Sequence, residues 1–420
     1  MASLEPESRN LRALLSSEIT KIMKEASTVP IYKDSVLQSH LLQKARMRIR
    51  LQLNACVSQS EPAGHSSALV TQYEICRASL TISHAITNPY YVTWDVNRYA
   101  DMVKSSYSQP DGAPSTEQKK LSKYFPMAVL GKFSEPATIV DNHGKILVWY
   151  LPNILSCSHV DLMNTATTEL HDYLLKSIPV TESAIDKKHS WRSDNFLVPE
   201  GGGKFGAGRV TMSPAYFMQR RERLQDPLVP SASYSAKSVQ HWLKAISGTE
   251  FFFNAITAII APELFEAGSA AVSKVVNVTR QPKKPVPVSE WPSIFTGMEL
   301  IANWITLSHR DAGGARSHYD LLASLGIGHD ATFSIKDLNA ELDYFPGTLA
   351  FIAGKVLEHS VGPWKIGERF VVAHFMKDKV HDRVGVSKPA FPVQMDLLQL
   401  LGSSVTDHRP RKRSGANWDS

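Results

Sequence analysis

The stretch GKVLEHSVGPWKIGERFVVAHFM, residues 354–376, decides the fold. It holds two short runs of apolar and β-branched residues, KVLEHSV and ERFVVAHF, with Gly and Pro between them. Similar runs precede it from residue 297 onward: NWITLSH, YDLLASLG, TFSI and TLAFIA. Short runs with turn signals roughly every 8–12 residues are typical of strands in a barrel or sandwich. We therefore expect a β-barrel or sandwich in this part of the chain.

The rest of the chain has a different pattern. Residues 1–100 are mostly helical in pattern, and residues 105–120 are polar and rich in Ser, Pro and Gly, as in a linker or mobile loop. A strand pair is predicted at 137–151, where ATIV and KILVWYL flank the turn DNHG. Residues 194–214 are glycine-rich and irregular, and helices follow, notably at 238–274. The chain as a whole is predicted to be α+β.

Composition excludes several classes of protein. The 420 residues suffice for two to three domains or one large elaborated domain, and 43% hydrophobic with 20% charged residues excludes collagen, coiled coil and wholesale disorder. Three cysteines without a CxxC pair argue against a disulfide framework and a cysteine zinc site. The N-terminus lacks the order of a secretory signal, and the most apolar run, 251–261, is too short to cross a bilayer of about 30 Å. We expect a soluble, intracellular protein.

Positive charge is gathered in short stretches. Lys and Arg exceed Asp and Glu by 46 − 40 = 6, a mild tilt toward polyanionic partners. The stretches are Arg46, Arg48 and Arg50; Arg220, Arg221 and Arg223; Arg280, Lys283 and Lys284; and Arg409, Arg411, Lys412 and Arg413. The last stretch is read either as a nuclear-localisation or phosphate-binding tail or as a solvated terminus, and the two readings carry equal weight.

Two strand-like segments carry residues that suit a metal. His309 and Asp311 stand at i and i+2, so on a strand their side chains share one face. His359 lies on a later strand-like run that a barrel can bring to the same point. Two histidines and one carboxylate form the facial triad of non-haem Fe(II) oxygenases. Arg369, ten residues after His359, could hold a carboxylate such as that of 2-oxoglutarate in a paired hydrogen bond. The competing reading is a set of barrel histidines that only make hydrogen bonds.

These segments resemble the fungal members of the TET/JBP branch of the Fe(II)/2-oxoglutarate dioxygenases. The resemblance rests on the triplet HRD at 309–311, on IKDLNAELDYFPGTLAF at 335–351, on residues 354–376, and on the lead-in EPATIVDNHGKILVWYLP at 135–152. It implies a double-stranded β-helix, or jelly-roll, with helices packed around it and a helical N-terminal extension. The implied parts are the extension at 1–120, the dioxygenase domain at 121–395 with its core at 297–378, and a basic tail at 396–420.

The resemblance also implies cofactors and a reaction. His309, Asp311 and His359 would bind Fe(II), and Arg369 would bind 2-oxoglutarate. Asn303 is six residues before His309 and, on an even strand spacing, would share its face, so it is a candidate for the other carboxylate of 2-oxoglutarate. The implied reaction oxidises a methyl group on a DNA base while 2-oxoglutarate and O2 yield succinate and CO2.

The implied partner is double-stranded DNA with methylated bases, in the nucleus. A base must be flipped out of the duplex to reach a buried iron, with basic residues on the flanking phosphates. 5-Methylcytosine would give hydroxymethyl-, formyl- and carboxylcytosine, and N6-methyladenine would lose its methyl as formaldehyde. No membrane partner is expected, and the oligomeric state stays open, with a monomer favoured.

Residues for base recognition are less well marked. Gly313 and Gly314 follow the HRD triplet where animal members have polar residues, so a roomier pocket could admit a purine. Asp337 could accept a hydrogen bond from an exocyclic amine, or simply form a turn. His374 would contact substrate only if a bulge turned it, since it lies on the opposite side of an ideal strand from Arg369.

The glycine-rich run GGGKFGAGR, residues 201–209, is a further candidate. Its backbone amides, with Lys204 and Arg209, could approach a phosphate. Formally it contains GxGxxG, but no strand precedes it and no βαβ unit follows, so a dinucleotide site is not expected. A flexible active-site loop is favoured over a plain surface turn.

Two other functions fit the same residues. The first is a 2-oxoglutarate hydroxylase acting on RNA, protein or a small molecule, because its cofactor residues would be identical. The second is an inactive module that binds nucleic acid. The intact set of four cofactor residues argues against the second function.

Overall fold

The computed structural model describes residues 4–26, 35–59, 61–62, 67–103, 121, 123–126, 128–177, 195–197, 203–217, 223, 226–278, 291–311 and 313–402. Of the cationic stretches, 280–284, 409–413 and two members of a third, Arg220 and Arg221, lie outside these residues, as do the predicted linker at 105–120 and the glycines at 201–202. The basic tail is described only as far as residue 402.

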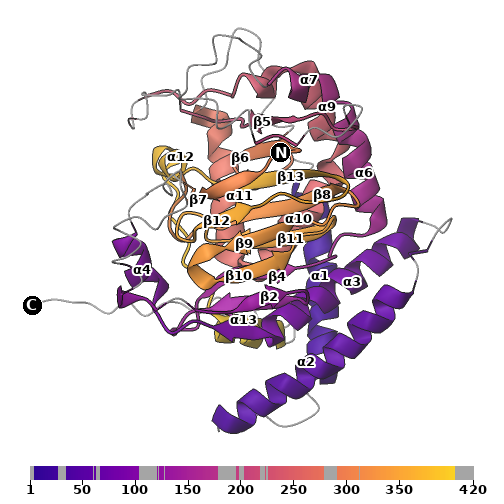
Figure 1. Cartoon of the computed structure of the whole chain (residues 1–420), viewed down its shortest axis with the longest axis vertical. Coiled ribbons are helices and arrows are strands. Elements are labelled where there is room, and N and C mark those ends of the chain that lie inside the picture. Colours follow the sequence, from indigo (N-terminus) through magenta and orange to yellow (C-terminus); the bar gives the residue numbers. More distant parts are fainter. Residues whose placement is uncertain are drawn as a thin grey trace, which may run out of the picture.

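Two β-sheets lie one over the other and form the core (Figure 1). The larger sheet has eight strands in the order β1-β3-β4-β11-β8-β13-β6-β5, and the smaller has five in the order β2-β10-β9-β12-β7. This is the predicted double-stranded β-helix within an α+β chain. The larger sheet consists of β1 (Pro89–Tyr91), β3 (Ala137–Val140), β4 (Ile146–Leu151), β11 (Thr348–Ile352), β8 (Asp320–Ile327), β13 (Glu368–Phe375), β6 (Gly297–Ala302) and β5 (Gly208–Met212). The smaller consists of β2 (Gly131–Phe133), β10 (Ala340–Asp343), β9 (Thr332–Ile335), β12 (His359–Val361) and β7 (Thr306–His309).

Burial explains why the central strands read as continuous apolar runs. Every residue of β4 and of β11 is buried, and β4 pairs with both β3 and β11. Strands covered on both faces need apolar side chains on both faces, so they lose the alternating pattern of a half-exposed strand. The predicted pair at 137–151 is the antiparallel pair β3–β4. The centre of the larger sheet is therefore buried on both sides. One face of this sheet meets helices, and the other meets the smaller sheet.

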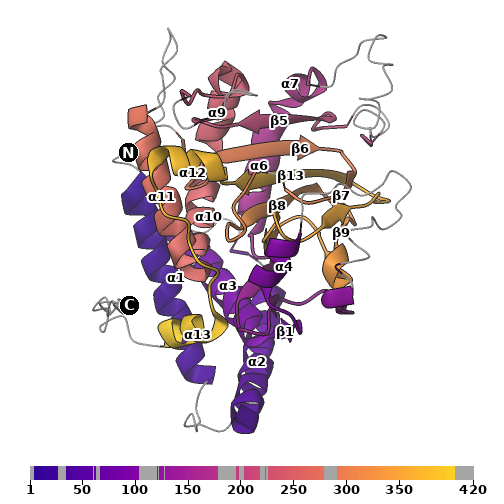
Figure 2. The same ribbon diagram turned by 90° about the vertical axis from the view of Figure 1, so that its left-hand side faces the viewer.

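Helices cover the outer face of the larger sheet (Figure 2). α1 (Leu4–Ala26) packs on α10 (Ser247–Ile260), and α3 (Ser67–Thr87) packs on β3 and β4. The helices of the first hundred residues are thus fixed to the core. The remaining helices are α2 (Ser35–Ser58), α4 (Val96–Met102), α6 (Cys157–Thr168), α7 (His171–Leu175), α9 (Lys237–Ala245), α11 (Pro262–Val278), α12 (Asp378–Val384) and α13 (Gln394–Gly402), with 3-10 turns η3 (Ser233–Ser235) and η5 (Lys336–Leu338).

One expectation about the fold is wrong. The segment 194–214 is not irregular throughout, because β5 at Gly208–Met212 forms the edge of the larger sheet against β6. The alternating burial of Arg209-Val-Thr-Met is a strand pattern that the preceding glycines hid. Among the described residues no single helix is long and apolar enough to span a membrane, although the bent pair α9–α10 passes that test by length and composition.

Candidate metal centre

The three predicted metal ligands come together at one edge of the smaller sheet. His309 ends β7 and His359 begins β12, and the two residues are direct partners in the antiparallel register. Their ring centroids lie 4.4 Å apart. Asp311 follows two residues after His309, where its backbone N–H donates to the carbonyl of Gly354 at 2.9 Å. Strand pairing and one backbone hydrogen bond therefore place all three side chains.

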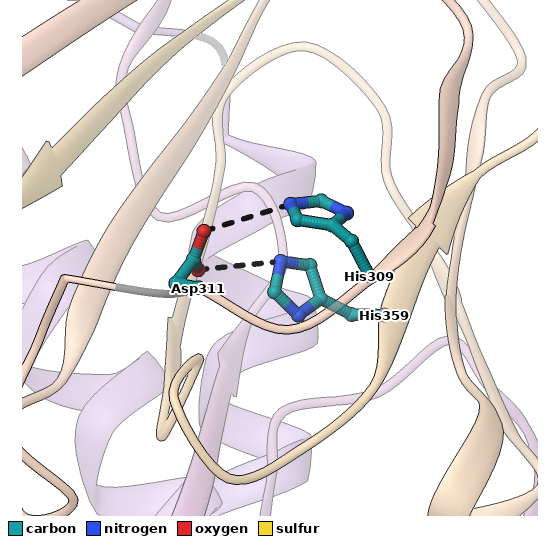
Figure 3. Close-up of side chains that lie close together, drawn as sticks. All are labelled: His309, Asp311 and His359. Atoms are coloured by element: carbon teal, nitrogen blue, oxygen red, sulfur yellow. Dashed lines mark ion pairs between the residues drawn. The ribbon is translucent and has the colours of Figure 1, made fainter. Parts of the chain in front are cut away.

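The orientation of both rings is fixed by their own strands. Nδ1 of His309 lies 2.8 Å from the carbonyl oxygen of Leu307, and Nδ1 of His359 lies 3.0 Å from that of Leu357. Because a carbonyl only accepts, each Nδ1 must carry a proton. Each Nε2 is therefore the ring nitrogen that can bind a metal through its lone pair. Figure 3 shows both Nε2 atoms turned toward the Asp311 carboxylate, each 3.5 Å from one of its oxygens.

This donor set fits a transition metal. One ligand atom from each of the three residues lies within 4.8 Å of the others. Two neutral imidazoles and one carboxylate suit Fe(II), and a set of three ligands leaves further coordination positions open. The side chain of Asp311 is 37% exposed and that of His359 only 5%, so the cluster opens on the Asp311 side. The predicted convergence is confirmed, and the binding of iron there is a proposal.

The carboxylate of Asp311 is held as an anion by its surroundings. Burial alone would raise its pKa, but while no metal is bound His309 and His359, when Nε2 carries a proton, outweigh burial through a hydrogen bond and their charges and lower the pKa. Asp320 on β8 lies against it, and burial together with the Asp311 charge raises the pKa of Asp320 well above its usual range. Asp320 therefore keeps its proton and donates a hydrogen bond to Asp311. Asp320 is not evident from the sequence, because it lies on another strand and belongs to no recognised triplet.

Gly354 completes this corner of the site. A Cβ built on it would collide with the carboxylate oxygens of Asp311 and Asp320. Only glycine lets the chain pass this close to both carboxyl groups.

A second cluster lies behind the ligands, on the opposite side of the same strands. The Arg310 guanidinium pairs with Asp337 at 2.8 Å and with Glu358 at 3.2 Å, and it contacts the hydroxyl of Tyr99 at 3.3 Å. Ser308 donates to Glu358 at 2.6 Å. Arg310 stands between two ligands and Glu358 immediately before the third. This buried network therefore joins β7 to β12 at the metal centre.

Asp337 belongs to this network. One of its oxygens accepts from Arg310 and the other accepts from the backbone N–H of Glu358 at 2.6 Å. Both oxygens thus already have protein donors. The geometry favours the turn-forming reading over that of a base reader, which stays an untested prediction.

Arg369 lies between the sheets without an acidic partner among the described residues. It is 1% exposed, NH1 donates to the carbonyl of Trp304 at 3.4 Å, and the guanidinium also contacts the hydroxyl of Tyr344. Its guanidinium carbon lies 5.3 Å from the ring centre of Tyr344 and 5.8 Å from that of Trp364, and Nε has no partner. Burial lowers its pKa, although Tyr344 opposes that shift. An unpaired buried cation needs an anion, and a carboxylate matches its two-pronged geometry.

Aromatic rings connect this arginine to the ligands. The ring of Phe333 lies 5.6 Å from that of His359 and 5.3 Å from that of Tyr344. Tyr344 in turn stacks on Arg369. The cation and the metal triad therefore border one aromatic layer between the two sheets.

The prediction that Asn303 and His309 share one face of a strand is wrong. β6 ends at Ala302 in the larger sheet and β7 begins at Thr306 in the smaller, so an even spacing does not give a common face. Asn303 turns the chain with a left-handed φ of 52°. Its side chain donates to the carbonyl of Gly206 at 3.2 Å and accepts from the backbone N–H of Arg369 at 3.2 Å. Asn303 thus fixes the backbone at Arg369, and its contact with 2-oxoglutarate stays a prediction.

The structure places His374 away from the triad. β13 pairs in unbroken register with β6 and β8, so the bulge that would have turned His374 is absent from it. The ring is fully buried, with Nε2 2.8 Å from Glu250 of α10 and aromatic contacts to Phe253 and Phe295. His374 fixes the sheet to its helical layer and is not a substrate contact.

In the described part of the glycine-rich run, residues 203–209, Lys204 is exposed whereas Phe205 to Gly208 are buried, and Gly313 and Gly314 after the triplet are half-buried. The backbone N–H of Lys204 donates to Glu368 at 2.9 Å, and Arg209 pairs with Glu299 at 3.2 Å. A Cβ at Gly313 would meet the side chain of Lys377. Gly314 lines a pocket of about 310 Å³ with Arg316, Lys355, Lys388 and Asp378, among others. Contacts of these residues with a substrate stay predictions.

Comparison with known proteins adds the family. A family model named Tet_JBP, described as the oxygenase domain of the 2OGFeDO superfamily, matches residues 218–378. A solved structure described as NgTET1 in complex with 5mC DNA is 14% identical, with 66% of this chain and 90% of that chain covered and a TM-score of 0.40. No curated protein matches. The matched segment contains the whole triad and Arg369. Residues 218–378 therefore match the TET/JBP-type oxygenase domain of the 2-oxoglutarate and Fe(II) dioxygenase superfamily.

Proposed function

We propose that this protein is an Fe(II)- and 2-oxoglutarate-dependent dioxygenase that oxidises the methyl group of methylated DNA bases. One observation carries the proposal: a His-Asp-His set with ligand atoms within 4.8 Å of one another, inside a TET/JBP-type domain. The unpaired guanidinium of Arg369 supports it, because the co-substrate has the carboxylate that this cation lacks.

The residues divide the work by position. His309, Asp311 and His359 would hold Fe(II), which when bound supplies the activation of O2 for methyl oxidation. Arg369 would bind the distal carboxylate of 2-oxoglutarate, and the rings of Tyr344 and Trp364 would shield that ion pair from water. Each round would insert one oxygen atom of O2 into the methyl group and the other into succinate, with loss of CO2. Asp320 would keep Asp311 in place by its hydrogen bond.

The substrate assignment rests on the family and on charge. The matched domain is of the TET/JBP type. The whole chain carries a formal net charge of +6, and several of its Lys and Arg residues are gathered in short stretches. We propose double-stranded DNA as the partner, with a flipped base at the iron and the nucleus as the location. 5-Methylcytosine is the first candidate, oxidised to its hydroxymethyl, formyl and carboxyl forms, and N6-methyladenine the second.

Mass spectrometry of nucleosides tests this proposal. Duplex DNA that carries both methyl marks is incubated with the protein, Fe(II), 2-oxoglutarate and O2, and a methylated RNA of the same sequence is run in parallel. The proposal expects oxidised cytosine or demethylated adenine in the DNA, with equal succinate, and neither with Asp311→Ala. Products confined to the RNA would contradict the DNA assignment. Succinate formed equally without any nucleic acid would contradict a nucleic-acid substrate altogether.

A further inference from the structure

Two cysteines face each other where the first helices of the chain meet. Cys56 lies near the end of α2 and Cys76 lies within α3, and the two thiols are hydrogen-bonded to each other. Cys56 is 8% exposed and Cys76 is half-buried. The pair lies 20 residues apart in sequence, and helix packing alone brings the sulfurs together.

We propose that Cys56 and Cys76 form a site of oxidative modification, at which hydrogen peroxide converts the two neighbouring thiols into a disulfide that joins α2 to α3. The proposal is independent of the dioxygenase activity. A disulfide needs two sulfur atoms that can meet, and the hydrogen bond between the thiols together with the packing of α2 on α3 places them next to each other. The composition alone, with three cysteines and no CxxC pair, does not reveal this pairing.

The two thiols differ in their charge. The hydrogen bond from Cys76 lowers the pKa of Cys56 to about 7, against the effect of burial and with help from Arg77. The same hydrogen bond and burial raise the pKa of Cys76. Cys56 is therefore the nucleophile and Cys76 the thiol that keeps its proton, which is the division of roles that disulfide formation requires.

The chemistry balances in two steps. The Cys56 thiolate attacks one oxygen of hydrogen peroxide, so the O–O bond breaks, an S–O bond forms, and the released hydroxide takes a proton to become water. The sulfur of Cys76 then attacks the sulfenic acid; the S–S bond forms, the S–O bond breaks, and the hydroxide leaves with the Cys76 proton as a second water. Two thiols are oxidised by two electrons and one peroxide is reduced to two waters.

Access to the pair selects small oxidants. Cys56 is buried in the hydrophobic core, so peroxide reaches it more readily than a bulky disulfide such as oxidised glutathione. Cys157 is the internal comparison. It is exposed at the start of α6, where burial and Glu61 raise its pKa, and no cysteine is recorded beside it among the described residues.

Peptide mapping under non-reducing conditions tests the proposal. The folded full-length protein is treated with hydrogen peroxide at pH 7, alkylated and digested. We expect a Cys56–Cys76 cross-linked peptide that is lighter by two hydrogen atoms than the two reduced peptides together. During peroxide treatment, Cys56 should become resistant to alkylation roughly tenfold faster than Cys157. Cys157→Ser should give the same cross-link. Cys76→Ser should abolish it and leave Cys56 as a sulfenic or sulfinic acid.

Other outcomes would overturn the proposal. Cys56 and Cys76 recovered as separate alkylated peptides after Cys157 has been oxidised would contradict it. So would cross-links of Cys157 with either partner at equal yield. The same treatment in denaturant provides the reference for random pairing, and a yield of Cys56–Cys76 no higher in the folded protein than in that reference would also refute the site.

Discussion

Arg369 and Arg310 are both buried, yet their surroundings are opposite. Arg310 has two carboxylate partners, Asp337 and Glu358, whereas Arg369 has none among the described residues. A buried ion pair and a buried lone cation respond differently to removal of the charge. Arg310 is therefore interpreted as a structural residue, and Arg369 as the residue that would bind an anionic ligand.

Replacing Arg369 by Met should weaken the use of 2-oxoglutarate without unfolding the protein. The loss of a charged, paired hydrogen bond to the co-substrate should raise the concentration needed for half-maximal succinate formation roughly 10–100-fold. The free energy of unfolding without 2-oxoglutarate should change by less than about 1 kcal/mol, because only aromatic contacts and one long hydrogen bond disappear. Succinate assays and urea titrations measure the two quantities. An unchanged requirement for 2-oxoglutarate would show that another residue binds it.

Replacing Arg310 by Met should destabilise the protein strongly. The substitution leaves the carboxylates of Asp337 and Glu358 buried without their cation, so the free energy of unfolding should fall by about 3–5 kcal/mol. Arg316→Met is the matched control, since Arg316 is 48% exposed and should change stability by no more than about 1 kcal/mol. Equal effects of the two substitutions in urea titrations would show that the ion pairs of Arg310 with Asp337 and Glu358 do not stabilise the fold.

Gly354→Ala should displace the Asp311 carboxylate. The new methyl group would collide with the carboxylates of Asp311 and Asp320, so we expect at least a tenfold loss of Fe(II) affinity. Gly362→Ala is the control, because a Cβ there meets no atom within 4 Å. Anaerobic titration compares the two variants. Wild-type affinity in Gly354→Ala would show that the close approach of the backbone is not required.

At the scale of elements, the pairing of β7 with β12 brings together the candidate metal ligands His309 and His359. The sequence allowed this to be predicted, because His309 and Asp311 stand at strand spacing and His359 starts a later strand-like segment, which the fold pairs with β7. It did not allow the place of Asn303 to be predicted, since a left-handed turn separates β6 from β7. The partners of Asp337 and the proximity of Asp320 were also hidden, because both contacts join strands or turns that are distant in sequence.

A second pair of histidines, His318 and His381, packs helix α12 against the core. His318 and His381 are buried with ring centroids 4.8 Å apart, and neither ring has a side-chain hydrogen-bond partner among the described residues. Burial lowers the pKa of His318 to about 4 and, with the neighbouring His318, that of His381 to about 3. Asp378, Asp382 and Lys388 are the nearest charged groups. Both rings are therefore neutral in the folded protein at pH 7.

Acidification should destabilise the fold through this pair. Below the ordinary histidine pKa of about 6.5 the unfolded chain takes up protons while the folded rings stay neutral, so stability falls as pH drops toward about 4. We expect a loss of about 2 kcal/mol per histidine between pH 6.5 and 5. Urea titrations of the wild type and of His381→Phe should differ in this slope, whereas His143→Gln, at a ring 59% exposed, should not change it. Parallel pH profiles for all three proteins would refute the role of the pair.

At the scale of the whole molecule, two stacked sheets hold a cation on one and a metal triad on the other. Short strands, turn spacing and the resemblance at 354–376 were enough to predict this core. The packing of α1 on α10 and of α3 on β3 and β4 was not predictable, because helices of the first hundred residues carry no pattern that identifies their partners. The edge strand β5 was hidden by its glycine-rich neighbours.

Anaerobic titration with Fe(II) tests the central claim most directly. The wild-type protein should bind one Fe(II) per chain, and Asp311→Ala and His359→Ala should each lose that binding while keeping the wild-type circular dichroism spectrum. Binding of Fe(II) with equal affinity and stoichiometry by both variants would contradict the claim that His309, Asp311 and His359 form the metal centre.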